Sequence, residues 1–157
     1  VLKHAIEFFD NNNQVFDSVL SLQATVPLVK PTTIKKVVNN FESSNCDSIG
    51  TISEIRHGHP YISKKLVGKE NNIAKDFLPL KLDVPRYPRQ KRPSLYYFNG
   101  SIFIRKRSLI TNIDESTNCM GHKPRTYLMD EKESINIDSK FDFLLAEIIY
   151  KQNQSNL

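Results

Sequence analysis

The sequence predicts an α/β fold on the basis of two observations. Short apolar runs of strand type alternate with amphipathic helical segments in the first and last thirds of the chain, which is the pattern of a sheet covered by helices. Hydrophobic residues make up 39% and charged residues 25% of the 157 residues, as in ordinary globular proteins. A chain of this length buries enough apolar surface to form one core. This composition argues against a disordered chain, a coiled coil or a collagen-like fibre.

The first third of the chain predicts two helices and two strands. Residues 1–10 carry apolar side chains at helical spacing, and residues 15–22 (VFDSVLSL) form an apolar run typical of a strand buried on both faces. A second helix begins at Pro31, and its apolar stripe consists of Ile34, Val37, Val38 and Phe41. A second strand over residues 47–55 follows. The order strand, helix, strand predicts a right-handed crossover between parallel neighbours.

The last third returns to regular structure. Residues 96–104 are strand-like, Ser108 begins a short helix, and residues 125–129 form a weak strand. We expect Ser139 to cap a final helix and Asp142 to complete a capping box. The apolar stripe of this final helix consists of Phe141, Leu144, Leu145 and Ile148.

The middle of the chain, residues 56–93, is polar, contains five prolines and shows no sustained periodicity. We therefore expect an α/β core made of residues 1–55 and 94–157, and an excursion made of residues 56–93. The few apolar side chains of the excursion, such as Phe77, are expected to pack on a second subunit.

The net charge of +5 favours polyanions or phosphorylated small molecules as partners, without choosing between them. Residues 81–92 hold five of the basic side chains against the single acid Asp83. No run of eighteen apolar residues and no secretion signal is present, and two cysteines suit free thiols in a reducing compartment. We therefore expect a cytoplasmic protein without a membrane anchor. The chain opens on Val1 within a helical pattern, as expected of a truncated protein.

Three separate segments resemble, in order, the motifs of one enzyme family. The segment LSLQATVP, which ends at Pro27, is similar to L-Q-P-T-S-P, and RQ...YYFNGSIFI, from Arg89 to Ile104, is similar to R-Q...N-G-A-I-Y-I. ESINIDSKFDFLLAE, from Glu133 to Glu147, is similar to S-I-D-I-D-T-x-x-D-F-x-x-A-E. These motifs are those of the acylneuraminate cytidylyltransferases, the CMP-sialic acid synthetases and their relatives that activate other nonulosonic acids. The resemblance spans about the whole chain.

The resemblance implies a Rossmann-like nucleotidyltransferase sheet and an excursion that forms a homodimer. It also implies a reaction in which CTP and an acidic nine-carbon sugar give a CMP-sugar and pyrophosphate, with Mg²⁺ holding the phosphates. Family enzymes begin with a glycine-bearing phosphate loop, and the five glycines of this chain form no such loop. The expectation is therefore the C-terminal portion of such an enzyme, incomplete without the nucleotide-binding loop.

Gln23 and Thr25 follow the carboxyl end of the first predicted strand, where open α/β sheets place ligands. The Gln23 amide can donate and accept hydrogen bonds, and Thr25 adds a hydroxyl, which suits a polyhydroxylated N-acyl sugar. The alternative for this segment is a capped turn. The resemblance favours a sugar site, although Val26 stands where the family has Ser and the Arg that often follows the family motif is absent.

Arg89 and Gln90 lie in the basic part of the excursion. The resemblance implies that arginines of the excursion reach the neighbouring subunit's site, where a guanidinium can bind a carboxylate through two parallel hydrogen bonds. The alternative is a solvated cationic face. The resemblance also places Asn99 and Gly100 at the sugar site, and the alternative for this pair is a hairpin turn. We expect the aromatic side chains beside that pair to lie in the core; they are Tyr96, Tyr97, Phe98 and Phe103.

Asp138 is the candidate magnesium ligand and catalytic residue, because the resemblance places it in the metal-binding motif. Magnesium needs only one or two carboxylates in addition to substrate phosphates and water. Asn136 stands where the family has the first aspartate, and its amide oxygen should bind the metal more weakly. A purely structural role for Asp138 near a helix N-terminus is the alternative.

Two other functions remain open. One is a non-enzymatic domain whose stretch from Lys81 to Phe103 binds RNA or single-stranded DNA through phosphate contacts and stacking. The other is a synthetase relative that has lost turnover, as Asn136 suggests. We favour cytidylyl transfer over nucleic-acid binding. His57 and His59 have no third metal ligand at a suggestive spacing, so we expect both to be structural or solvated.

Overall fold

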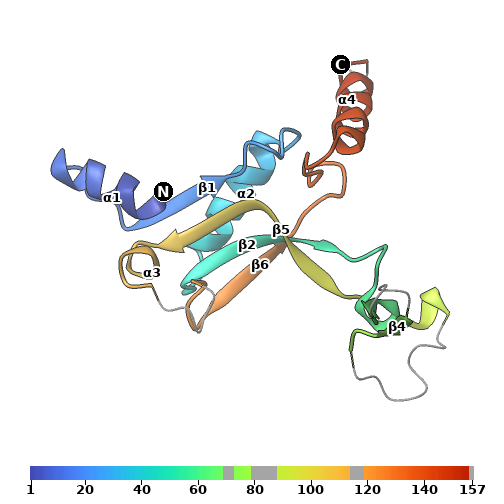
Figure 1. Cartoon of the computed structure of the whole chain (residues 1–157). Coiled ribbons are helices and arrows are strands. Elements are labelled where there is room, and N and C mark those ends of the chain that lie inside the picture. The colour runs from blue at the N-terminus through green and yellow to red at the C-terminus, as the bar shows by residue number, and fades with distance from the viewer. Residues whose placement is uncertain (69–72, 79–87, 114–118, 156–157) are drawn as a thin grey trace. The chain divides into compact units, whose positions relative to one another are not determined.

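The computed structural model describes residues 1–68, 73–78, 88–113 and 119–155. They form a mixed α/β structure, which confirms the predicted fold class (Figure 1). Its helices are α1 (Leu2–Asn11), α2 (Pro31–Glu42), α3 (Ser108–Thr111) and α4 (Lys140–Gln154), with 3₁₀ turns η1 (Pro60–Ile62) and η3 (Arg89–Lys91). Its strands are β1 (Ser18–Leu22), β2 (Ser48–Glu54), β3 (Lys64–Val67), β4 (Ile73–Asp76), β5 (Tyr96–Lys106) and β6 (Pro124–Leu128).

The chain divides into two compact units. The first consists of Val1–Ser53 and Phe98–Leu157, and the second consists of Glu54–Tyr97. Both boundaries fall within strands, because β2 extends to Glu54 and β5 begins at Tyr96. Each of these two strands therefore contributes residues to both units. Lys81 and Arg86 of the basic stretch lie outside the described residues.

The first unit contains a four-stranded sheet in the order β1-β5-β2-β6. β1 pairs antiparallel with β5 from Ser18↔Lys106 to Leu22↔Ile102, whereas β2 pairs parallel with β6. The prediction that the first two strands are direct neighbours is wrong, because β5 lies between them. Hydrophobic periodicity identifies a strand but does not encode its order in a sheet, so the sequence pattern could not reveal this insertion.

The core of this sheet lies against α2. Val37 of α2, Ile49 of β2 and two isoleucines of β5, Ile102 and Ile104, are at most 3% exposed. Partly buried side chains surround them, and these are Val29, Ile34, Val38, Phe41 and Tyr127. The predicted apolar stripe of α2 is thus confirmed as the face that covers the sheet. Burial of one such side chain contributes about 1.5–3 kcal/mol.

A buried amide joins the two central strands of the sheet. Asn99 Oδ1 accepts hydrogen bonds from the Thr51 hydroxyl at 2.7 Å and from the Ser101 amide at 3.1 Å. Its Nδ2 donates to Ser53 Oγ at 2.9 Å, so the side chain is anchored on β2. Gly100 follows with φ +78°, a left-handed conformation that glycine adopts without strain. Because β5 continues through both residues, the hairpin alternative for Asn99 and Gly100 is excluded.

The final helix begins with the predicted capping box. The Asp142 amide donates to Ser139 Oγ at 3.4 Å, and the Ser139 amide donates to Asp142 Oδ2 at 2.8 Å. The apolar stripe has the predicted spacing, but its side chains remain exposed, from 39% at Leu145 to 75% at Phe141. The buried residue of α4 is instead Ala146. A stripe at helical spacing therefore shows which face is apolar and not which surface covers it.

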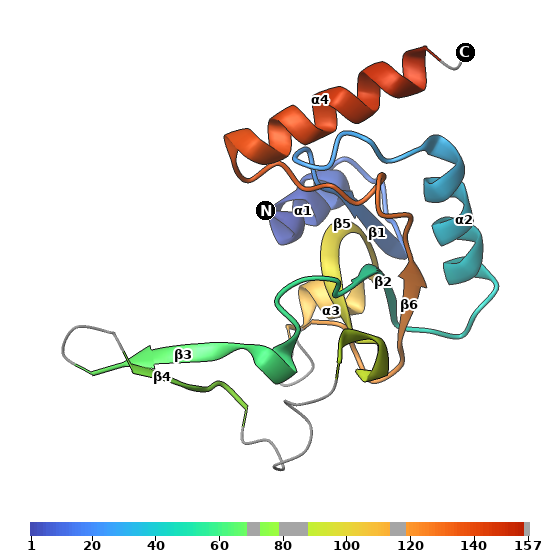
Figure 2. The same ribbon diagram turned by 90° about the vertical axis from the view of Figure 1, so that its right-hand side faces the viewer.

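The second unit contains a separate two-stranded antiparallel sheet of β3 and β4, paired from Lys64↔Asp76 to Val67↔Ile73 (Figure 2). Its side chains are exposed apart from Val67, which is half-buried. Two strands alone are marginally stable in water, so the hairpin depends on the rest of its unit or on a partner. Across the described helices, none is long and apolar enough to cross a membrane.

We expect Asn99→Ala to lower the free energy of unfolding by about 3 kcal/mol, because the buried Ser101 amide and Ser53 hydroxyl would lose their Asn99 partner and the Thr51 hydroxyl would lose one of its acceptors. Chemical denaturation measures this change. Asn39→Ala, at an exposed position of α2, is the matched control. A loss below about 1 kcal/mol would show that the amide is not a structural link.

We expect the cap of α4 to weaken in acid. The Ser139 hydroxyl, which donates to the Asp142 carboxylate, holds the pKa of Asp142 below its usual value, and burial opposes this only partly. A lowered pKa stabilises the folded state above the usual carboxylate value of about 4, and this stabilisation is lost as pH falls through the folded value. Hydrogen-exchange protection of the first turn of α4 should therefore decrease below about pH 4.

The variant Asp142→Asn serves as the control for this titration, because its side chain cannot ionise. Its first-turn protection should not depend on pH in the same range. Equal protection of the unmodified protein at neutral and acid pH would contradict the proposed cap titration.

Candidate active site

The loop after β1 forms a tight turn that exposes both predicted sugar-binding side chains. The Val26 amide donates to the Gln23 carbonyl at 3.1 Å, and Val26 itself is only 4% exposed. Gln23 and Thr25 both precede this buried residue, and their side chains are exposed. The turn predicted as the alternative is therefore present, and it presents the two polar groups to solvent.

This loop contacts two other predicted site segments within the first unit. The Gln23 amide donates to the Ser101 carbonyl at 3.1 Å, which places the loop beside the Asn99–Gly100 part of β5. The Ile137 amide donates to the Thr25 carbonyl at 2.8 Å, which places the loop beside Asp138. The loop after β1 therefore contacts both the Asn99–Gly100 part of β5 and the segment before α4.

Glu133 is a residue of this region that the sequence reasoning missed. Its carboxylate accepts a hydrogen bond from the Lys30 amide at 3.2 Å and forms an ion pair with Lys30 Nζ at 3.2 Å, while Glu133 is only 5% exposed. Lys30 is the N-cap position of α2, so the carboxylate also faces the favourable end of the helix dipole. No local motif marks this acid, because its partner lies more than a hundred positions earlier.

Asp138 and Asn136 lie side by side before α4. Asp138 is exposed, and its Oδ2 accepts a hydrogen bond from Asn136 Nδ2 at 2.7 Å. The other amide atom, Asn136 Oδ1, is buried and has no hydrogen-bond partner in the described structure. The amide nitrogen, and not the oxygen, thus faces the carboxylate. For both residues to bind one cation, the Asn136 amide would have to turn over.

These donors fit a magnesium ion that takes few ligands from the protein. Within the described residues, no three His, Cys, Asp or Glu side chains form a metal-binding cluster. One accessible carboxylate nevertheless suffices for magnesium when phosphate oxygens and water complete the octahedron. Asp138 provides this carboxylate, and Asn136 Oδ1, which is buried in this structure, would become a second donor only after the amide turns over.

Three of the four aromatic side chains expected in the core are exposed. Tyr96, Tyr97 and Phe98 are 48–50% exposed, whereas Phe103 is half-buried and packs against Phe98 with ring centroids 5.7 Å apart. The expectation of a core position is therefore wrong for the first three. They lie at the start of β5, where the strand leaves the packed part of the sheet.

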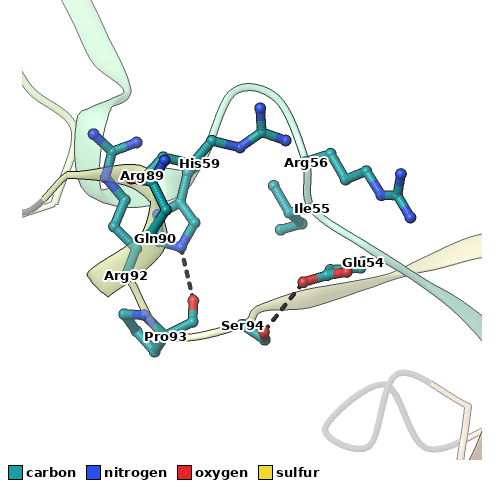
Figure 3. A pocket seen from close by; sticks show the side chains of 9 residues that line it. All are labelled: Glu54, Ile55, Arg56, His59, Arg89, Gln90, Arg92, Pro93 and Ser94. Carbon is teal, nitrogen blue, oxygen red and sulfur yellow. Dashed lines mark hydrogen bonds between the residues drawn. The ribbon is translucent and has the colours of Figure 1, made fainter.

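Arg89 and Gln90 lie in a pocket of the second unit. The pocket has a volume of about 450 Å³, and Figure 3 shows its nine lining residues, namely Glu54, Ile55, Arg56, His59, Arg89, Gln90, Arg92, Pro93 and Ser94. Three of the lining residues are arginines and one, Glu54, is an acid, whose carboxylate accepts a hydrogen bond from Ser94 at 3.1 Å. The lining is therefore cationic and suits an anion such as a carboxylate or phosphate.

The side chains of Arg89 and Gln90 are exposed, and the described structure assigns no hydrogen bond or ion pair to either of them. Both belong to η3, which is closed by hydrogen bonds from the Lys91 amide to the Pro88 carbonyl at 2.8 Å and from the Arg92 amide to the Arg89 carbonyl at 3.3 Å. The turn holds the two side chains on adjacent positions. They are thus available to a ligand or to a second chain.

No family model matches the chain. Several curated proteins do, including the following three. The chain is 26% identical over 144 residues to "Post-translational flagellin modification protein B" of Campylobacter coli, covering 87% of this chain and 54% of that protein. It is 29% identical over 150 residues to "CMP-N,N'-diacetyllegionaminic acid synthase" of Legionella pneumophila, covering 95% and 60%, respectively. It is 27% identical over 144 residues to "N-acylneuraminate cytidylyltransferase" of Streptococcus agalactiae serotype V, covering 92% and 32%.

The chain thus spans between about a third and three fifths of the length of these relatives. The alignments cover most of its own residues. They confirm the resemblance that the three motifs indicated: over most of its length this chain is similar to acylneuraminate cytidylyltransferases.

Proposed function

We propose that this chain forms the sugar-binding and metal-binding part of a cytidylyltransferase, which transfers CMP from CTP to a nonulosonic acid and releases pyrophosphate. The observation that carries the proposal is the hydrogen bond between Ile137 and Thr25, because it brings the exposed polar turn next to the exposed carboxylate of Asp138. The names of the relatives support the substrate class.

In the proposed site, Gln23 and Thr25 bind hydroxyl or N-acyl groups of the sugar, because both side chains are exposed and can donate and accept hydrogen bonds. The Asn99 side chain is occupied by its β2 partners and fixes the adjoining backbone. Gly100 has no Cβ and lets a ligand approach that backbone closely.

Asp138 would hold the magnesium ion, with Asn136 as a neutral second donor after rotation of its amide. When bound, the ion supplies electrostatic stabilisation of the phosphate oxygens around the attacked phosphorus. The exposed position of Asp138 leaves room for such a complex. The Asp138 amide donates a hydrogen bond to the Asp142 carboxylate at 3.3 Å, and this contact restrains the backbone at Asp138.

Arg89 and Gln90 would bind the carboxylate or phosphate of the substrate from the cationic pocket of the second unit. We propose that they act in a homodimer, in which this unit serves the site of the neighbouring subunit. A cytoplasmic location is part of the same proposal, because Cys46 and Cys119 are both free thiols and suit a reducing compartment.

The test of the proposed function measures CMP-sugar formation from CTP and an acidic nonulosonic sugar by the protein in its natural full-length form. We expect Asp138→Ala to lower the rate by about a hundredfold, because the main metal ligand is lost. Asp130→Ala, another exposed acid in the same connection, is the control and should keep near-normal activity.

Full activity of the Asp138→Ala variant would remove the metal assignment. Sugar binding without turnover in the unmodified protein would instead identify a relative that has lost catalysis. Salt-sensitive binding of single-stranded nucleic acid with no response to CTP would favour the nucleic-acid alternative.

The role of Asn136 can be tested by adding the missing carboxylate. We expect Asn136→Asp to lower the Mg²⁺ concentration needed for half-maximal activity by about tenfold, because two adjacent carboxylates attract the cation more strongly than one carboxylate and an amide. A magnesium titration of activity measures the change, with Asn112→Asp at a remote exposed position as the control. An unchanged magnesium requirement would place residue 136 outside the metal's reach.

A further inference from the structure

His59 is a buried histidine that connects the two ends of the second unit. It is only 7% exposed, whereas the neighbouring His57 is exposed. Its Nδ1 accepts a hydrogen bond from the Tyr61 amide at 3.2 Å, and its Nε2 lies 3.1 Å from the Pro93 carbonyl oxygen (Figure 3). The ring also packs edge-on against Tyr61, with centroids 4.9 Å apart.

These contacts define the protonation of the ring. Because Nδ1 accepts from a backbone amide, the proton of the neutral imidazole must lie on Nε2, which then donates to the Pro93 carbonyl. Both nitrogens are therefore occupied within the protein. A role as a metal ligand or as a proton carrier would require one of these two contacts to break.

Pro93 follows the turn that carries Arg89 and Gln90 directly in the sequence. The C-cap residue of η3 is Arg92, and Pro93 is the next residue. Two further hydrogen bonds join the same two chain segments, from the Ile55 amide to the Leu95 carbonyl at 2.8 Å and from the Ser94 hydroxyl to Glu54 at 3.1 Å. The His59 contact is the one of these three that lies closest in sequence to η3. It therefore fixes the base of the turn against the opposite wall of the pocket.

We propose that His59 is a positioning residue, which holds η3 so that Arg89 and Gln90 project from the cationic pocket toward an anionic substrate. This inference rests on the proposed function for the identity of the substrate. The placement of η3 by His59 depends only on the contacts described above. His59 touches no substrate in this account and acts through the Pro93 carbonyl.

The matched variants separate the two contacts of the ring. His59→Phe keeps an aromatic ring and removes both hydrogen bonds. His59→Gln retains a donor that can reach the Pro93 carbonyl. His59→Asn retains an acceptor for the Tyr61 amide, and its own NH2 group is on a side chain too short to reach the Pro93 carbonyl. His57→Gln, at the exposed neighbour, is the control for a change of histidine in the same loop.

The first measurement is amide hydrogen exchange in the full-length protein, which needs no ligand. We expect His59→Phe and His59→Asn to accelerate exchange at the Lys91 and Arg92 amides about tenfold, the effect of losing one buried hydrogen bond. His59→Gln should restore their protection. The Ile102 amide, which donates to Thr51 in the first unit, should remain unchanged in every variant. If His59→Phe unfolds the second unit, His59→Asn provides the comparison.

The second measurement is the KM and kcat for an N-acylneuraminate with CTP. Because Arg89 and Gln90 would bind the sugar in both ground and transition states, we expect His59→Asn to raise KM about tenfold with little change in kcat. His59→Gln should return KM to within about twofold of normal.

Unchanged exchange at Lys91 and Arg92 in both His59→Phe and His59→Asn would overturn the proposal. Accelerated exchange with an unchanged KM would also overturn it, since the turn would then move without affecting substrate binding. A protein that shows no turnover in any form would contradict the proposed function, and the exchange measurement would still decide whether His59 positions η3.

Discussion

One backbone hydrogen bond, from the Ile137 amide to the Thr25 carbonyl, joins segments from opposite ends of the chain and defines the candidate site. The ion pair of the exposed Lys30 with the buried Glu133 reinforces the same junction, because a carboxylate that is only 5% exposed is tolerated when a charged partner and a backbone amide satisfy it. Through these contacts the connection before α4 is placed over the loop that follows β1. Without them, Gln23 and Asp138 would have no fixed geometry relative to each other.

The second unit is held together near its pocket by polar contacts. Among its described residues no apolar side chain is buried, and its two-stranded sheet exposes most of its side chains. Its order near the pocket comes instead from polar contacts between its two ends, in which His59, Ser94 and the Ile55 amide take part. We propose that the His59 imidazole, through such a contact, determines where the Arg89 and Gln90 side chains point.

Much of the fold could be predicted from the sequence, since α2 and the strands on either side of it show clear hydrophobic patterns. The capping box of Ser139 and Asp142 could also be predicted, because it is a local motif with a fixed spacing. Strand order could not, because β5 enters between β1 and β2 from far along the chain. Glu133 was missed because its partner Lys30 is also far away in the sequence. The exposed stripe of α4 shows that helical spacing identifies an apolar face but not the surface that covers it. The candidate site residues were proposed from motif resemblance, and the contact of the Gln23–Thr25 loop with the segment before Asp138 required the structure.

We propose that the turn after β1 and the Asp138 carboxylate before α4 bind one metal–substrate complex. Manganese can replace magnesium at oxygen-rich sites, and it broadens the NMR signals of nearby nuclei. The direct measurement is therefore the broadening of backbone amide signals when Mn²⁺ and CTP are added to the full-length protein. If both segments line one metal site, the signals of Gln23 and Ile137 should broaden together, while those of α1 remain sharp. Broadening at Ile137 without any effect at Gln23, or at neither, would contradict it.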